Sequence, residues 1–181
     1  GVILAAFVSV QCSGEYQSDQ AWARADSIVN SIKKPAFPDK TFNIADYGAR
    51  KGGEIMNTGA INAAIVACSE EGGGKVVIPE GKFLTGPIHL KSNVNLHISE
   101  NATLLFSTNP EDYLPLVRTR WEGVDCFNYS PLIYANNKKN IAITGKGTLH
   151  GQATRDNWWP WKGEKEDGWE KGMPSQKGPE G

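Results

Sequence analysis

The sequence predicts an all-β protein, a right-handed parallel β-helix (a solenoid) with a capping helix on its N-terminal side. From residue 75 onward, short stretches that alternate apolar and polar residues are separated by Gly, Pro, Asn or Ser. In addition, residues 92–104 (SNVNLHISENATL) resemble residues 139–149 (KNIAITGKGTL), so that Leu96 aligns with Ile143, 47 residues later. Such a repeat indicates stacked coils, and we expect 47 residues to make about two of them.

Residues 1–17 are predicted to be a processing signal. The stretch GVILAAFVSV is apolar, is too short to span a bilayer, and is followed by Cys12. Two interpretations stay open, a secretory signal that is cleaved and a bacterial lipoprotein signal in which Cys12 is lipidated. Both predict a protein that leaves the cytoplasm, as a secreted or periplasmic protein or an outer-membrane lipoprotein, with a possible lipid anchor at Cys12 as its only membrane attachment.

Residues 18–40 are predicted to form a helix and a linker. Ser18 or Asp19 is the expected N-cap, and Lys33, Lys34 and Pro35 end the helix.

The remaining residues, 41–181, are predicted to be the N-terminal coils of the solenoid. A second helix begins at Asn57 or Thr58 and ends before the three glycines at 72–74. We expect it to cover the apolar end of the first coil, because an open solenoid end exposes backbone and apolar side chains. The expected strands lie within residues 75–81, 86–92, 93–99, 102–107, 131–137, 140–145 and 147–151.

Composition excludes some partners and metal sites. The formal net charge of −1 provides no overall field to attract nucleic acid, so a charged ligand has to be recognised by a local cluster. Cys68 falls on the apolar face of the second helix, which predicts a buried hydrophobic residue. His89, His97 and His150 have no Cys or carboxylate at ligand spacing, so no metal is expected and the histidines are interpreted as ladder or surface residues.

Three longer segments carry a family resemblance. FNIADYGA with the following helix and GGG, then FLTGPI, and then RWEGVDCFNYSPLIYANNKKNIAITGKGTLHG together resemble the N-terminal part of glycoside hydrolase family 28. These are the polygalacturonases and related pectin hydrolases, and the resemblance is to the bacterial type. It covers about residues 20–172 and implies a right-handed parallel β-helix.

The resemblance also implies the chemistry. Family members hydrolyse α-1,4 links between galacturonic acid residues with inversion, using an acid and a base carboxyl group roughly 6.5–9.5 Å apart and no cofactor. The family's aspartates lie in Asn-x-Asp and Asp-Asp motifs, assisted by Gly-His-Gly and Arg-x-Lys, and none of these four patterns occurs in the 181 residues. We therefore assign no catalytic residue, expect the carboxylates C-terminal to residue 181, and expect this chain alone to be inactive.

Arg118, Arg120 and Trp121 are the candidate substrate-binding residues. Two guanidinium groups suit uronate carboxylates, and an indole suits the face of a sugar ring. The alternative is that the arginines pair with Glu122 and Asp125 and that Trp121 packs a loop. The cluster of Trp158, Trp159 and Trp161 leaves the same choice between sugar contact and packing.

Two other functions stay open at this point. A β-helix without catalysis serves as a carbohydrate-binding or adhesive module. A polysaccharide lyase on the same scaffold abstracts a proton and usually requires Ca²⁺ with a basic residue. The expected macromolecular partner of the chain is pectin or polygalacturonate, and nucleic acid is not expected.

Overall fold

The computed structural model describes residues 15–157 and 159–173, and the chain divides into one unit up to Lys34 and a second from Pro35 onward. In the first unit, α1 (Glu15–Ser31) exposes Trp22, Ile28 and Val29 to solvent. The helix begins at Glu15, so the predicted start at Ser18 or Asp19 was wrong. Residues 15–17 contain no Gly or Pro, and nothing in them stops the helix from extending backwards.

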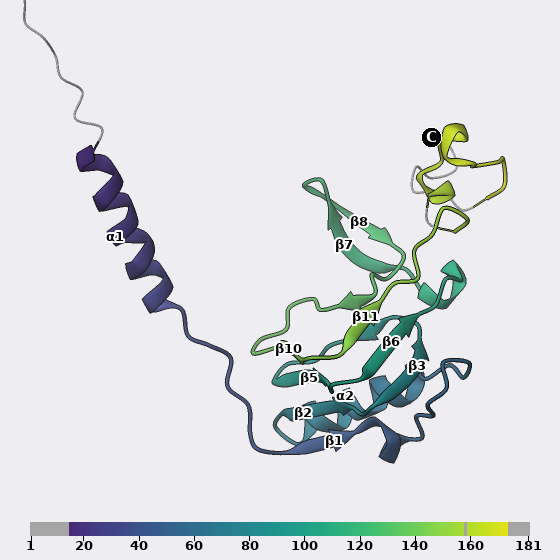
Figure 1. Cartoon of the computed structure of the whole chain (residues 1–181), viewed down its shortest axis with the longest axis horizontal. Helices are drawn as coiled ribbons and strands as arrows, with labels where there is room; N and C mark the ends of the chain where they lie inside the picture. The colour runs from purple at the N-terminus through teal and green to yellow at the C-terminus, as the bar shows by residue number, and fades with distance from the viewer. Residues whose placement is uncertain (1–14, 158, 174–181) are drawn as a thin grey trace, which may run out of the picture. The chain divides into compact units, whose positions relative to one another are not determined.

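The second unit is a right-handed parallel β-helix with three sheets (Figure 1). Its parallel strands are β1 (Thr41–Asn43), β2 (Gly74–Ile78), β3 (Gly81–Thr85), β4 (Ile88–His89), β5 (Val94–Ile98), β6 (Ala102–Phe106), β9 (Ile133–Tyr134), β10 (Ala142–Gly145) and β11 (Thr148–His150). The sheet orders are β1-β2-β5-β10, β3-β6-β11 and β4-β9, and every pairing within them is parallel. The predicted fold class is confirmed.

Apolar side chains of successive coils stack in rows inside the solenoid. In the first sheet Val76 pairs with Leu96, and Leu96 pairs with Ile143, as the alignment of the two repeats predicted. Leu104 lies between Phe83 and Leu149 in the second sheet. Because side chains of a strand alternate between its faces, the apolar period of two places Val76, Leu96, Phe83 and Leu104 in one continuous core.

The coil length differs from the expectation. Val76 and Leu96, in adjacent strands, are 20 residues apart, whereas Leu96 and Ile143, also in adjacent strands, are 47 apart. The prediction that 47 residues make two coils was therefore wrong, because one coil carries an insertion. The insertion contains η2 (Pro110–Tyr113) and an antiparallel hairpin of β7 (Val117–Trp121) and β8 (Val124–Asn128).

The helix α2 (Thr58–Glu70) covers the first coil, as expected. Its Ile61, Ile65 and Cys68 are fully buried against η1 (Ile44–Tyr47) and the nearby strands. Burial of Cys68 confirms its predicted role as a small hydrophobic residue.

Asn57, at the start of α2, fastens the preceding loop to the solenoid. Its side chain accepts a hydrogen bond from the Arg50 amide and donates to the carbonyl oxygens of Arg50, Ile55 and Leu84, at 2.7–3.2 Å. Asn57 is 2% exposed, so these hydrogen bonds replace the ones to water that its side-chain amide loses on burial.

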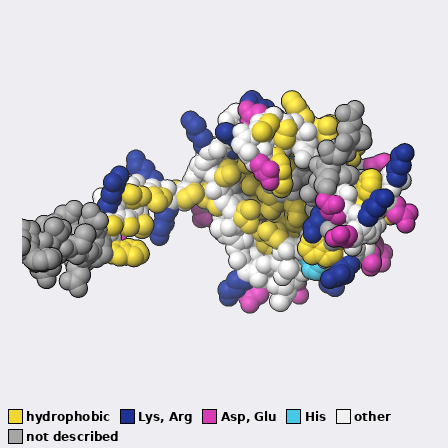
Figure 2. Space-filling view, turned by 90° about the horizontal axis from the view of Figure 1, so that it is seen from above, with side chains coloured by type: hydrophobic (Ala, Val, Ile, Leu, Met, Phe, Trp, Pro, Cys, Tyr) yellow, Lys and Arg dark blue, Asp and Glu magenta, His cyan; other side chains and the backbone are white. Residues whose placement is uncertain are grey.

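Apolar side chains remain exposed in the last described coil. Ile143 is 46% and Leu149 is 43% exposed, although their partners Leu96 and Leu104 are fully buried. Figure 2, seen from above the view of Figure 1, shows a broad hydrophobic surface surrounded by polar and charged side chains. Beyond this coil, the described residues form two short turns, η3 (Pro160–Lys162) and η4 (Lys165–Asp167). None of the helices in the described ranges has the length and apolar content needed to cross a membrane.

Candidate functional site

The β7–β8 hairpin positions the charged residues of the candidate site. Glu122 and Gly123 form its two-residue loop with φ of 47° and 88°, the pair of positive values that a type I′ turn requires. Arg120 lies opposite Asp125 in the antiparallel register, and Arg118 lies two residues from Arg120. Because opposite residues share a face and successive residues alternate, all three charged side chains lie on one face of the hairpin.

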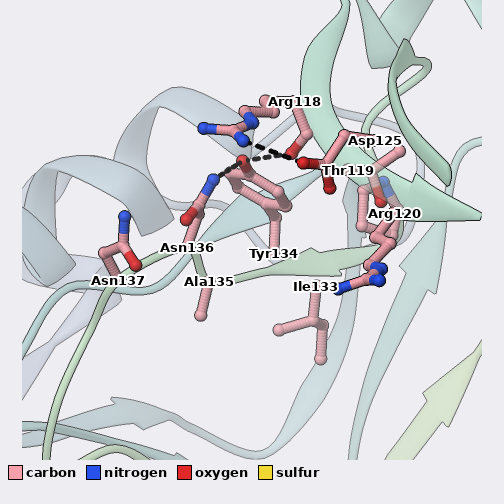
Figure 3. A pocket seen from close by; sticks show the side chains of 10 residues that line it. Arg118, Thr119, Arg120, Asp125, Ile133, Tyr134, Ala135, Asn136 and Asn137 are labelled. Carbon is pink, nitrogen blue, oxygen red and sulfur yellow. Dashed lines mark hydrogen bonds and ion pairs between the residues drawn. The ribbon is translucent and has the colours of Figure 1, made fainter. Parts of the chain in front are cut away.

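This face borders a pocket between the hairpin and the segment that follows β9 (Figure 3). The pocket has a volume of about 610 Å³, which lies within the roughly 300–1,000 Å³ typical of small-molecule sites. Its lining residues are Arg118, Thr119, Arg120, Asp125, Pro131, Ile133, Tyr134, Ala135, Asn136 and Asn137.

Arg118 and Asp125 form an ion pair across the hairpin. The Arg118 Nη2 donates to the Asp125 Oδ2 at 3.0 Å, and both side chains are largely exposed. A pair in this setting contributes only about 0–1 kcal/mol to stability, but it orients the Arg118 guanidinium. The alternative interpretation expected the arginines to pair with Glu122 and Asp125, and the pairing with Asp125 is observed.

Arg120 is held differently. Its Nε donates to the Gly123 carbonyl oxygen at 3.2 Å, which fixes the side chain beside the turn. Within the described residues, Arg120 has no ion pair, so the suggested pairing with Glu122 does not occur. In Figure 3 its guanidinium points toward Ile133, away from the guanidinium of Arg118.

Tyr134 connects the solenoid to the hairpin. Its hydroxyl donates to the main-chain carbonyl oxygen of Arg118 at 2.7 Å and accepts from the Asn136 Nδ2 at 3.1 Å. One phenol thereby joins β9, the segment after it and β7, which are the walls of the pocket.

His89 supports Tyr134 from the neighbouring coil. The two rings have centroids 5.2 Å apart at a tilt of 54°, and the His89 Nε2 lies 3.0 Å from the Ser130 Oγ. Desolvation by burial lowers the pKa of His89 from its ordinary value of 6.5, and the charge of Lys91 lowers the pKa further. The neutral imidazole is therefore favoured behind the pocket wall.

The structure brings together two of the three predicted substrate-binding residues. Arg118 and Arg120 line one pocket, whereas Trp121 does not line it and is 62% exposed. Trp121 alternates with Arg120 along β7 and is the last residue of the strand before the turn. The role of all three in substrate binding stays a prediction.

Cys12 and Trp158 fall outside the described residues, as does the side chain of Trp161. Trp159 is partly exposed, and the Lys162 Nζ lies 4.6 Å from the centre of its ring. The choice between sugar contact and packing for the three tryptophans therefore stays open.

The described histidines act as ladder and surface residues, as predicted. His97 Nδ1 lies 2.9 Å from the Thr144 Oγ1 of the next coil, and His150 Nδ1 accepts from the Gln152 amide. Across residues 15–157 and 159–173, no three His, Cys, Asp or Glu side chains come together as metal ligands.

Sequence reasoning missed the hairpin and the amides of Asn136 and Asn137 in the pocket. The signal for the hairpin was present, because the Xaa-Gly pair Glu122-Gly123 separates two runs with high β-propensity, VRTRW and VDCFN. The two asparagines had no such local signal, since their position depends on how the insertion folds back.

Comparisons with known proteins agree with this architecture. Residues 41–101 match a family model described as rhamnogalacturonase A/epimerase, pectate lyase-like. The exo-poly-alpha-D-galacturonosidase of Dickeya chrysanthemi is 37% identical over 134 residues. Among solved structures, the hyperthermoactive exopolygalacturonase from Thermotoga maritima is 47% identical with a TM-score of 0.79, and the family 28 exopolygalacturonase of Yersinia enterocolitica is 33% identical with a TM-score of 0.56.

These similarities cover much of this chain and little of the relatives. The Dickeya match spans 70% of this chain and 22% of the relative. The two structural matches span 87% and 62% of this chain, and 35% and 21% of the Thermotoga and Yersinia chains. The chain thus corresponds to between a fifth and about a third of each of these proteins.

Proposed function

Because the chain belongs to glycoside hydrolase family 28, we propose that it forms the N-terminal coils of an enzyme that hydrolyses the α-1,4-galacturonosyl links of pectin. The observation that carries the proposal is the likeness to the Thermotoga exopolygalacturonase, at 47% identity over 87% of this chain. The substrate of the proposed enzyme is pectin or polygalacturonate.

The proposed reaction is inverting hydrolysis by two carboxyl groups. One protonates the leaving oxygen while the other activates water on the opposite face of the sugar, at a separation of roughly 6.5–9.5 Å. The 181 residues contain neither an Asn-x-Asp nor an Asp-Asp motif. We accordingly place both carboxyl groups in coils C-terminal to residue 181, and we propose that the present chain contributes the capped scaffold and a wall for substrate.

The test is an assay of the complete gene product on polygalacturonate. We expect release of reducing ends with inverted anomeric configuration, unaffected by a chelator, and no release by the isolated 181-residue chain. Unsaturated products that absorb in the near ultraviolet, and that no longer form when a chelator is added, would show that the enzyme is a lyase and not a hydrolase. Binding of polygalacturonate without turnover would leave a carbohydrate-binding module.

We also propose export from the cytoplasm. The support is the apolar run at residues 2–10, which precedes Cys12. The proposed destination is secretion, the periplasm or the outer membrane, with a lipid on Cys12 in the last case. Fractionation of the native host tests export, and loss of membrane association in Cys12→Ser tests lipidation. Retention in the cytosol with residues 1–11 attached would contradict both.

A further inference from the structure

The pocket beside the β7–β8 hairpin carries one uncompensated positive charge. Its lining includes two arginines and one aspartate, and the Arg118–Asp125 ion pair neutralises one arginine. Arg120 donates its Nε–H to the Gly123 carbonyl oxygen, and in the described part of the chain no hydrogen bond or ion pair engages its two terminal nitrogens. A guanidinium with both terminal nitrogens available is suited to a carboxylate, which it binds in two parallel hydrogen bonds.

The opposite wall supplies groups of a different kind. Asn136 and Asn137 bring amides from the segment after β9, while Ile133 and Pro131 bring an apolar surface. The Arg120 guanidinium points toward the Ile133 side of the pocket (Figure 3). A cation beside amides and a small apolar surface matches an acidic sugar, whose carboxylate, hydroxyl groups and C–H face require these three partners.

Both walls are positioned before a ligand arrives. The Tyr134 hydroxyl donates to the Arg118 carbonyl oxygen and accepts from Asn136, and the turn at Glu122 and Gly123 fixes the end of the hairpin. Ordering these groups therefore costs little on binding, which favours affinity.

We propose that this pocket binds the carboxylate of a uronic acid residue, with Arg120 as the group that distinguishes an acidic sugar from its neutral counterpart. The identity of the sugar as galacturonate rests on the proposed function. The pocket would hold a galacturonate unit of the bound polysaccharide, and Arg120 is a binding residue rather than a catalytic one.

The experiment measures binding to the complete gene product by calorimetry, using digalacturonate and α-1,4-galactobiose, in which CH₂OH replaces each carboxylate. Arg120→Gln removes the charge, Arg120→Lys keeps the charge and removes the fork, and Lys138→Gln is the control. Lys138 is an exposed cation that does not line the pocket. Thermal melting verifies that each variant is folded.

We expect Arg120→Gln to weaken digalacturonate binding at least tenfold, Arg120→Lys to weaken it less, and Lys138→Gln to change it less than twofold. Galactobiose should bind at least tenfold more weakly than digalacturonate to the wild type and equally to all variants. Equal weakening by Lys138→Gln, or equal affinity for the two sugars, overturns the proposal. Displacement of digalacturonate by millimolar inorganic phosphate also overturns it, since the site would then be a general anion site.

The outcome separates this proposal from the proposed function. If the wild type cleaves polygalacturonate and Arg120→Gln leaves KM and digalacturonate affinity unchanged, the hydrolase function is supported and the uronate pocket is contradicted. If the wild type does not cleave polygalacturonate but binds digalacturonate in a way that depends on Arg120, the uronate pocket is supported and the hydrolase function is contradicted.

Discussion

The Tyr134 hydroxyl and the Arg118 carbonyl oxygen, 2.7 Å apart, link the solenoid wall to the hairpin beside the pocket. We predict that Tyr134→Phe loosens the hairpin while the aromatic packing on His89 persists, because a neutral hydrogen bond contributes only about 0.5–1.5 kcal/mol. Hydrogen exchange measured by mass spectrometry should be faster in residues 117–128 and unchanged in α2. Tyr129→Phe, at an exposed tyrosine, is the control, and equal exchange in both variants would contradict the assignment.

Asn57 is predicted to be a stability determinant. Asn57→Ala removes the side chain that binds Arg50, Ile55 and Leu84, so the Arg50 amide and the Arg50 and Ile55 carbonyl oxygens lose this partner, whereas the Leu84 carbonyl oxygen keeps the Asn57 amide. We expect a loss of about 2–4 kcal/mol, seen as a lower Tm. Asn128→Ala removes one exposed hydrogen bond to the next amide and should cost less than about 1 kcal/mol. Similar Tm values for the two variants would refute the role of Asn57.

Two glycines with left-handed backbones are expected to respond differently to alanine. Gly145 has φ of 106°, and a Cβ there would overlap the Ile98 carbonyl oxygen of the preceding coil. Gly123 has φ of 88° and nothing within 4 Å of the same atom. Gly123→Ala should cost only the backbone strain of about 1–2 kcal/mol. Gly145→Ala should lower the Tm considerably more, and equal shifts would show that the coils separate easily at this position.

Stability is predicted to fall in mild acid because of His89. Burial and Lys91 lower the pKa of the folded imidazole below 6.5, so between these two values the unfolded chain binds a proton that the folded chain does not. The contribution is complete above about pH 6.5 and is lost as the pH falls through the lowered pKa. Tm measured from neutral to mildly acidic pH should decline less steeply in His89→Asn. Lys91→Gln should also reduce the decline, and an unchanged slope in both variants would exclude His89 as the cause.

The two described cysteines should differ in thiol reactivity. Cys68 is fully buried, and desolvation followed by the charge of Glu71 raises its pKa to about 11, whereas Cys126 is partly exposed on β8. In a Cys12→Ser background, a disulfide reagent at mildly alkaline pH should label Cys126 rapidly and Cys68 only after denaturation. Cys126→Ser should abolish the rapid phase. Rapid labelling that survives this substitution would mean that α2 opens.

The solenoid was predictable because apolar and polar residues alternate along each strand, and this local pattern shows which side chains are buried. The register of Leu96 with Ile143 follows from two stretches that present the same apolar positions, and any one-residue shift would turn their side chains outward. The coil length was not predictable in the same way. Residues 107–132 form an excursion that leaves and rejoins the stack, and its length says nothing about whether it forms a coil of its own.

The candidate site was predictable only in part. Arg118 and Arg120 were found from their chemistry and both line the pocket, whereas their neighbour Trp121, chosen on the same grounds, does not line it, and its role in substrate binding stays a prediction. Asn136 and Asn137 reach the pocket only after the hairpin folds back beside β9. That arrangement involves the hydrogen bond from the Tyr134 hydroxyl to the Arg118 carbonyl oxygen. Any residue type has such a carbonyl oxygen, so neither residue type nor spacing predicts this bond.

Each new strand of the solenoid pairs in parallel with a strand that precedes it along the chain, beginning with β2 on β1 and ending with β10 on β5 and β11 on β6. A polypeptide leaving the ribosome N-terminus first could therefore build this fold in the order of synthesis, with each new rung pairing to a completed one. Since α2 precedes β2 and packs against it, the starting end is covered as soon as the first rung forms. At each stage the apolar surface left exposed would be that of the newest rung, as Ile143 and Leu149 are in the last described coil.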